Sequence, residues 1–259
     1  KAALNSFDRA IALKPELADA HFNRGNALVE LGLHQKALSS YNKAIALNGA
    51  YSDAYANRGN AYRELKLFDE ALKSFDEALI HKPNSFEAHF NRAKTYQDQR
   101  KYKLAVEDFK KSLQIRPLFT EAHYELGRSL KEMMLFKEAK ASYEKAIQLT
   151  PGEAKFYHSL GVCLGDLRNY EQALAEHQKA IVLDPGHLNA FIGCGVTLSE
   201  LGRFDEAIEY YNKALKINAD SASTRLNRSL LLLLKGDFER GFREYEARWD
   251  ALEGEEKVS

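Results

Sequence analysis

The five prolines of the chain are separated by multiples of one interval, and this spacing constrains the fold more than any other feature. They are Pro15, Pro83, Pro117, Pro151 and Pro185, so that each interval is either 34 or twice that number. Proline interrupts a helix because it lacks the backbone N–H and its ring clashes with the preceding turn. We therefore expect a structural unit that closes once in each such interval, and this period indicates a repeat array and excludes a single globular domain.

Charge and composition exclude several classes of function. Lys and Arg together number 37, as do Asp and Glu, so the chain lacks the basic excess typical of nucleic-acid-binding proteins. No apolar run approaches the roughly 18 residues of a membrane span, and no signal-peptide pattern is present. Two cysteines do not make a disulfide framework. We therefore expect a cytoplasmic protein that contacts neither membranes nor nucleic acids and holds no cofactor or metal ion.

The repeat is visible when units of the proline interval are aligned from Ala18 onward, without insertion or deletion. Unit position 8 is always small, positions 20 and 27 are mostly alanine, and position 24 is aromatic in six of seven units, with His177 as the exception. The predicted single array covers residues 1–255. It consists of a half repeat at 1–17 and full repeats at 18–51, 52–85, 86–119, 120–153, 154–187, 188–221 and 222–255, before a tail at 256–259.

Each unit contains two patterns of helical spacing, at positions 4, 8 and 11 and at positions 17, 20, 24 and 27. A short turn such as Leu31-Gly32 separates them. Each unit is therefore expected to be a pair of antiparallel helices that buries its apolar face by stacking on its neighbours. The predicted fold class is all-α, an α-solenoid. Cys163, Cys194 and the histidines in repeat slots are expected to be packing residues.

The motif Tyr55-x-x-Arg58-Gly59-x-x-Tyr62, followed by Ala71-x3-Phe75 and Pro83, resembles the tetratricopeptide repeat, with Arg in place of its usual Leu. The resemblance extends over residues 1–255, and its sevenfold repetition makes it specific. It implies a right-handed superhelix with a concave and a convex side. Residues 233–249 look like the closing unit of bacterial tetratricopeptide proteins, in many of which the repeats lead into a glycosyltransferase domain.

Both ends of the array suggest a piece of a longer protein. Residues 1–17 match only the second half of a unit. Near the other end, Leu230 to Leu234 form an apolar run, and Phe242, Tyr245 and Trp249 form an aromatic stripe. A helix that is apolar all round is normally buried. Either the last helix caps the array, or these apolar ends mediate self-association or contact another domain.

Ligands are expected on the first helix of each unit, because stacking occupies the other faces. At about 100° per residue, positions 2, 5, 6, 9, 12 and 13 share one stripe, which lines the concave groove in the resembling family. The candidate groove residues are Phe22, Asn23, Asn26, Asn57, Asn60, Phe90, Asn91, Tyr124 and Asn227. An acidic row at position 13 lies beside them: Glu30, Glu64, Asp98, Glu132, Asp166 and Glu200.

These residue types favour an extended protein ligand. Asparagine offers both donors and an acceptor to a peptide main chain, as in the similar asparagine ladder of O-linked N-acetylglucosamine transferases, and an acidic row favours a basic or polar ligand. Chaperone-binding members of the family use lysines and arginines at positions 5 and 6, which never occur there in this chain.

No phosphate-binding loop, nucleophile elbow or metal motif is present, so no catalytic residue is expected. The leading hypothesis is a non-enzymatic interaction scaffold that binds an extended peptide or a partner protein in its groove. The alternative is the substrate-recruiting arm of a larger O-linked glycosyltransferase.

Overall fold

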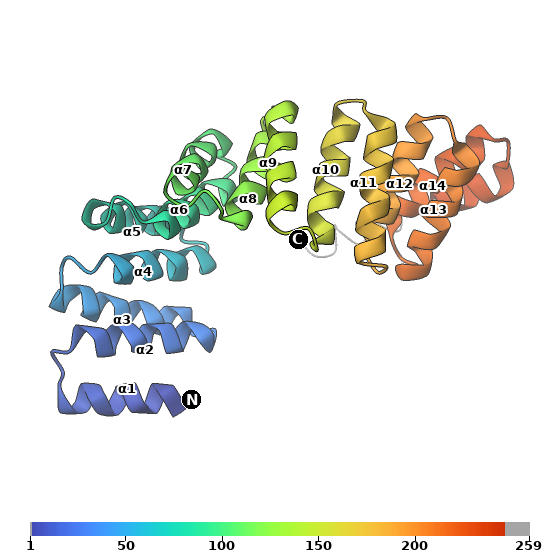
Figure 1. Ribbon diagram of the computed structural model, residues 1–259. Coiled ribbons are helices and arrows are strands. Elements are labelled where there is room, and N and C mark those ends of the chain that lie inside the picture. The colour runs from blue at the N-terminus through green and yellow to red at the C-terminus, as the bar shows by residue number, and fades with distance from the viewer. Residues whose placement is uncertain (1, 247–259) are drawn as a thin grey trace. The chain divides into compact units, whose positions relative to one another are not determined.

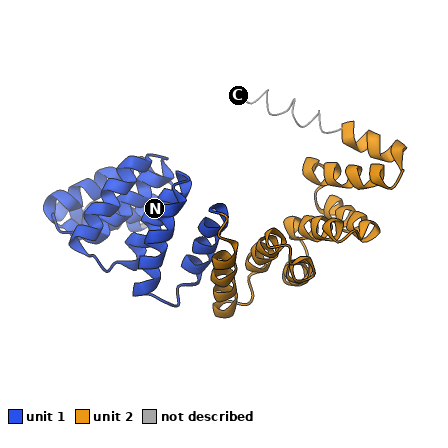
Figure 2. Ribbon diagram, turned by 90° about the horizontal axis from the view of Figure 1, so that it is seen from above, with its two compact units in different colours: residues 1–133 blue, residues 134–259 orange. Residues whose placement is uncertain are grey.

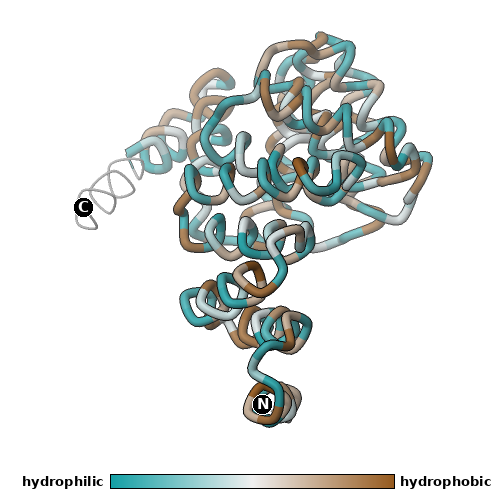
Figure 3. The backbone as a smooth tube through the Cα atoms, turned by 90° about the vertical axis from the view of Figure 1, so that its left-hand side faces the viewer, coloured by the Kyte–Doolittle hydropathy of each residue, from teal (hydrophilic) through white to brown (hydrophobic). Residues whose placement is uncertain are grey.

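The computed structural model describes residues 2–246, and every regular element in this part of the chain is a helix. The chain forms two compact units, residues 1–133 and residues 134–259 (Figure 2). Apolar and polar residues alternate along the helices of both units (Figure 3). Within residues 2–246, no helix is long and apolar enough to cross a membrane.

The helices of both units recur with the period of the prolines (Figure 1). Unit 1 contains α1 (Ala2–Leu13), α2 (Ala18–Glu30), α3 (His34–Leu47), α4 (Ser52–Glu64), α5 (Phe68–His81), α6 (Phe86–Asp98), α7 (Tyr102–Ile115) and α8 (Thr120–Glu132). Unit 2 contains α9 (Phe136–Leu149), α10 (Ala154–Asp166), α11 (Tyr170–Leu183), α12 (Leu188–Glu200), α13 (Phe204–Ile217) and α14 (Ala222–Leu234), and residues 238–246 are also helical.

Within each unit, every helix packs against the next helix of the chain, which confirms the predicted all-α solenoid of stacked helix pairs. The first helices of successive repeats also contact each other, α2 with α4, α4 with α6 and α10 with α12. The second helices of unit 1 differ, since among the described helices α3 does not contact α5 and α5 does not contact α7. The first helices therefore form the tighter, inner layer of each unit.

The alanine and aromatic positions form the core between the two helices of a repeat. In the first six repeats, the residues at positions 20, 24 and 27 are all at most 2% exposed, with Tyr41, Phe75 and His177 among the largest. Position 8 is small because the aromatic ring of position 24 lies against it. A Cβ atom on Gly25 would lie 2.4 Å from the Tyr41 ring.

The sequence predicted only some of the positions of the first helix that are buried. Positions 3 and 10 are buried as well, at most 8% exposed in every repeat, in a set that includes Ala54, Thr95, Cys163 and Thr197. The reason is that a first helix packs against two second helices, its own and the preceding one, as α4 does with α5 and α3, and α12 with α13 and α11. Cys163 and Cys194 are both free and 0% exposed, as expected of packing residues.

Four arginines at position 7, where the family usually carries leucine, link adjacent repeats. Each donates to position 23 of its own repeat and to position 25 of the preceding one. The guanidinium of Arg92 contacts Asp108 at 2.6 and 2.8 Å and Asp76 at 2.6 Å. Arg24, Arg58 and Arg228 repeat this pattern.

Histidines at position 4 hold the turns between repeats. The Nε2 atoms of His21, His89 and His123 lie 2.9, 3.1 and 2.8 Å from the carbonyl oxygens of Pro15, Pro83 and Pro117. In the last repeat Arg225 takes the same slot and donates to the carbonyl of Ala219, which stands at the proline position. The structure thus gives these periodic histidines a structural role.

Position 15 adopts a left-handed backbone in all seven repeats, although only three of them carry glycine there. Its φ is 70° at Gly32 but also 57° at Arg100 and 60° at Lys66. At Arg100 the turn is closed by bonds from Arg100 N to Gln97 O and from Lys101 N to Tyr96 O. This is the Schellman arrangement, which favours glycine at this position.

Changing Arg100 to glycine should therefore stabilise the protein by about 0.5–1 kcal/mol, because a side chain is strained at positive φ. The reverse change, Gly202→Ala, should destabilise it by a similar amount. Urea unfolding monitored by circular dichroism measures both effects. A lower midpoint for Arg100→Gly would show that Arg100 makes contacts that outweigh its backbone strain.

Candidate functional site

The candidate site is the exposed stripe on the first helices, here called the first-helix face and defined by repeat positions 2, 5, 6, 9, 12 and 13. Most of its residues are exposed or half-buried, in contrast to positions 3 and 10 of the same helices. Each of the two compact units has its own part of the first-helix face.

In unit 1, two of the predicted asparagines are tied to each other across adjacent repeats. The Nδ2 group of Asn57 donates to Oδ1 of Asn26 at 2.8 Å, and the hydroxyl of Tyr41 donates to the same oxygen at 2.8 Å. These bonds fix both amides and leave Asn26 Nδ2 and Asn57 Oδ1 for other partners. One repeat further, Phe75 has no hydroxyl, and Oδ1 of Asn60 is buried without a hydrogen-bond partner.

The other asparagines, Asn23, Asn91 and Asn227, are half-buried at position 6. Glu125 takes this position in the fourth repeat and is only 4% exposed, paired with Arg128 at 2.9 Å. The structure therefore brings together Asn26 and Asn57 but does not join all predicted asparagines in one hydrogen-bonded ladder.

The predicted aromatic residues differ in how much surface they offer. Phe22 and Tyr124 are half-buried, and the Phe22 ring lies 4.9 Å from the Tyr51 ring. Phe90 is only 8% exposed, and its ring lies 5.6 Å from Phe109 and 4.7 Å from Phe119. Phe90 thus contributes mainly to packing, whereas Phe22 and Tyr124 keep part of their rings at the surface.

All six members of the acidic row are exposed, and each is the last residue of its helix. An anion at a helix C-terminus opposes the helix dipole, an effect of about 0.3–1 kcal/mol. Some receive local partners: Arg63 lies 3.0 Å from Asp98, and Lys131 lies 3.7 Å from Glu132. The carboxylates of the acidic row therefore do not stabilise their helices. They give one edge of the first-helix face a negative charge.

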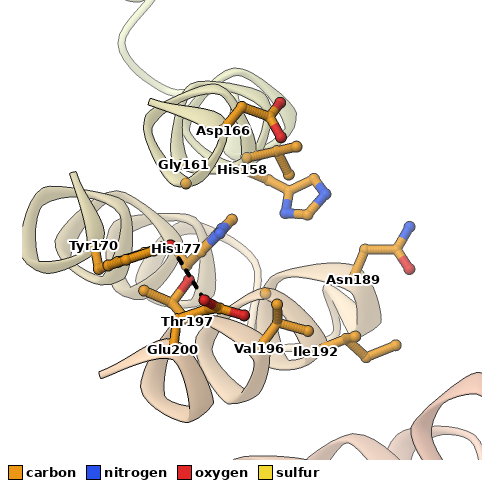
Figure 4. Close-up of a pocket in the computed structure, with 13 residues that line it drawn as sticks. His158, Gly161, Asp166, Tyr170, His177, Asn189, Ile192, Val196, Thr197 and Glu200 are labelled. Carbon is orange, nitrogen blue, oxygen red and sulfur yellow. Dashed lines mark hydrogen bonds between the residues drawn. The ribbon is translucent and has the colours of Figure 1, made fainter. Parts of the chain in front are cut away.

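In unit 2 the first-helix face contains a pocket of about 480 Å³ between α10, α11 and α12 (Figure 4). The predicted residues Asp166 and Glu200 are part of its lining. Tyr170 closes one side and donates its hydroxyl to Glu200 at 3.1 Å. Val162, Ile192 and Val196 supply apolar surface. A volume of this size is typical of ligand sites.

The pocket exists because this pair of repeats lacks side chains that the earlier repeats carry. At position 12, Gly165 replaces the long side chains of Arg63, Gln97 and Lys131. In unit 1, the Gln97 amide reaches the next first helix and donates to Glu125 O at 3.0 Å and to Ser129 Oγ at 2.9 Å. Gly193 likewise stands where earlier repeats have asparagine, glutamate or serine.

Two histidines form the inner wall of this pocket. The rings of His158 and His177 are 5.1 Å apart, and His187 lies 5.2 Å from His158. Nδ1 of both His158 and His177 is buried without a hydrogen-bond partner. Burial, reinforced by the neighbouring histidines, lowers the pKa of His158 to about 4 and that of His177 to about 3. Both imidazoles are therefore neutral at pH 7.

His158, Gly165, Gly193 and the pocket role of His177 were absent from the sequence prediction. The departures of these positions from the repeat pattern were the available signal. Among the residues that the structure describes, no group of three or more His, Cys, Asp or Glu side chains could hold a metal ion, and this includes the three histidines. The lining offers hydrogen-bond acceptors, negative charge and apolar surface.

The last repeat leaves apolar side chains at the surface. Leu231 and Leu232 of α14 are buried, but Leu230 is 48% and Leu234 65% exposed, so part of the predicted apolar run lies at the surface. Phe242 is also exposed, whereas Trp249 lies outside the described residues.

Comparison with known families agrees with the repeat geometry. Tetratricopeptide repeat models match residues 18–51, 52–85, 86–118, 120–153, 152–220 and 195–255, and a TPR repeat model matches residues 1–32. The chain is a tetratricopeptide repeat protein. None of these models supports the predicted likeness of the last repeat to those before glycosyltransferase domains.

Solved structures of tetratricopeptide repeat proteins resemble the chain along much of its length. YrrB, described as a tetratricopeptide repeat protein with an unusual peptide-binding site, is 26% identical with a TM-score of 0.63, covering 73% of this chain and 97% of YrrB. MamA is 27% identical with a TM-score of 0.62, covering 68% and 96%. A protein from Parabacteroides merdae, 18% identical with a TM-score of 0.71, covers 90% and 92% and shows the fold alone. Among curated proteins, none matches this chain.

Proposed function

We propose that this tetratricopeptide repeat protein is a non-catalytic scaffold that binds an extended segment of a partner protein on its first-helix face. The observation that carries the proposal is the fixed amide pair of Asn26 and Asn57, held by a 2.8 Å bond and by Tyr41. An amide with fixed orientation can bind a main chain without selecting its side chains. The likeness to YrrB, a peptide-binding protein of the same fold, supports this function.

The charge of the face favours a basic segment. The six carboxylates at the helix C-termini extend along both units, within a protein whose overall formal charge is zero. Their negative potential would attract a positively charged chain and exclude an acidic one. Chaperone tails that end in acidic residues are therefore poor candidates for this site.

Changing Asn23, Asn57 and Asn91 together to alanine should weaken binding of a ligand peptide by about 10- to 100-fold, since each lost hydrogen bond contributes about 1 kcal/mol. The probe is a peptide enriched on the immobilised wild-type protein from a random dodecapeptide phage library. Fluorescence polarisation measures its affinity.

The control variant changes three exposed residues on the second helices, Lys43, Glu77 and Lys110, to alanine. It should keep wild-type affinity. Equal affinity of the asparagine variant and the wild type, or failure of any peptide to enrich, would contradict the proposed function.

A second proposal is that the array recruits substrates for a glycosyltransferase domain of a longer protein. It rests on residues 233–249 and on the exposed apolar surface near the end, where Phe238 and Phe242 are 60% and 54% exposed. The full reading frame tests it directly, because a stop codon soon after Ser259 would exclude such a domain. The same surface would equally suit self-association, which light scattering would detect.

A further inference from the structure

We infer that the pocket between α10 and α12 is a specificity site for an arginine side chain of the bound segment. This inference rests on the proposed function and adds the chemistry of one anchoring residue. It depends on the geometry of unit 2 alone.

Two ring nitrogens at the pocket have no hydrogen-bond partner. His177 is only 2% exposed and lines the pocket, yet its Nδ1 has no hydrogen-bond partner. Nδ1 of His158 is in the same state, and both rings face the space between α10 and α12 (Figure 4). Buried polar atoms are rarely left without partners. In a neutral imidazole one nitrogen carries the proton and the other accepts. With the proton on Nε2, Nδ1 of each histidine is the acceptor, and these two atoms then suit a ligand that brings donors.

The charged residues that line the pocket are acidic. Asp166 and Glu200 lie at the pocket as the last residues of α10 and α12, where the carbonyl ends of both helices add negative potential. No lysine or arginine is among the described residues that line the pocket. A cation is therefore favoured over a neutral or acidic group.

The pocket combines apolar surface with separated polar groups. Val162, Ile192 and Val196 offer apolar surface to an aliphatic stem, while the acceptors surround the space from three helices. Guanidinium carries five donors in a fixed plane and is more weakly hydrated than an ammonium group. Arginine therefore matches several separated acceptors better than lysine, whose charge is a compact point.

Gly165→Gln tests the pocket without disturbing the packing. A Cβ atom on Gly165 would meet nothing within 4 Å. Gln97, at the same repeat position, shows how a glutamine reaches the next first helix. The new side chain should occupy the pocket in the same way, and it replaces a helical glycine, so that the fold is retained. Circular dichroism verifies this retention.

The selection experiment uses the whole protein. A random dodecapeptide phage library is first depleted on immobilised Gly165→Gln and then enriched on the wild type, so that only pocket-dependent peptides survive. These peptides should share an arginine. Replacing it with citrulline, which has the same shape but no charge, should lower affinity at least about tenfold, and lysine should bind with intermediate affinity.

Two protein variants complete the test. Glu200→Gln should weaken binding of these peptides by about fivefold or more. Glu209→Gln, at an exposed position of the second helix α13 outside the first-helix face, should leave their affinity unchanged. Enriched peptides that bind equally well with citrulline, or survivors that lack arginine, would overturn the inference.

A parallel selection without depletion separates the two proposals. If it yields peptides that lose affinity for the triple asparagine variant, while depletion on Gly165→Gln leaves no survivors, the arginine site is wrong and the proposed function stands. If neither selection enriches a peptide, both are wrong.

Discussion

Replacing Arg92 with leucine is expected to lower the free energy of unfolding by about 3 kcal/mol, because it leaves a buried carboxylate without its main partner. Asp108 is 2% exposed and receives two hydrogen bonds from Arg92. Burial alone would raise the pKa of Asp108, but the bonds from Arg92 and His89 outweigh it and lower the pKa. Urea unfolding at pH 7, monitored by circular dichroism, measures the loss.

The fourth repeat provides a matched control for this prediction. It carries Leu126 and Ser142 at the positions of Arg92 and Asp108, and both are buried. The double variant Arg92→Leu with Asp108→Ser should therefore recover most of the lost stability, since it removes the unpaired charge as well. If the double variant is as unstable as Arg92→Leu alone, the loss comes from the bond of Arg92 to Asp76 or from packing.

Acid should destabilise the protein through the two pocket histidines. The folded state holds the pKa of His158 near 4 and that of His177 near 3, against 6.5 for an ordinary histidine. Above pH 6.5 both are neutral whether the chain is folded or unfolded. As pH falls below 6.5 the unfolded chain takes up protons that the folded protein excludes, so stability falls. At pH 5 the loss should be about 2–4 kcal/mol from these two groups.

The variant His177→Phe tests the source of this pH dependence. Phe75 and Phe109 occupy the same repeat position, so phenylalanine is compatible with the packing. It should remove about half of the slope of stability against pH between pH 6.5 and 5, because one of the two proton-excluding groups is gone. His81→Gln, at an exposed position, controls for the loss of a histidine as such. An unchanged slope in His177→Phe would assign the acid sensitivity to other groups.

Much of the fold follows from the repeat arithmetic. The spacing of five prolines fixed a register in which Ala71, Phe75 and Ala78 share one helical face, and all three are 0% exposed. A periodic sequence pattern predicts the features that all repeats share. The core recurs in every repeat, so the pattern predicts it. The periodic pattern did not predict the burial of Thr95 at position 10, because threonine is not an apolar residue. Thr95 is 0% exposed, and its hydroxyl donates to Asn91 O within its own helix.

The sequence predicted less of the candidate site than of the fold. The acidic row and the asparagines were found because they recur, whereas the pocket of unit 2 results from departures from the repeat. Gly165 is unremarkable by itself. It opens a pocket only because Gly193, in the next repeat, also lacks a side chain, and because His177 replaces the aromatic ring at position 24 of the repeat that contains Gly165. Such coincidences become visible only when the first helices of two successive repeats are placed side by side.

If the ligand lies on the first helices, hydroxyl-radical footprinting of the protein with an enriched peptide will detect it there. Each face carries reactive side chains that are open to solvent. Tyr124 and Val196 report on the first helices, while Ile80 and Val182, 67% and 79% exposed, report on the second helices. The account predicts that the peptide protects Tyr124 or Val196 and leaves Ile80 and Val182 as reactive as before. Protection of Ile80 or Val182, with no change on the first helices, would contradict it.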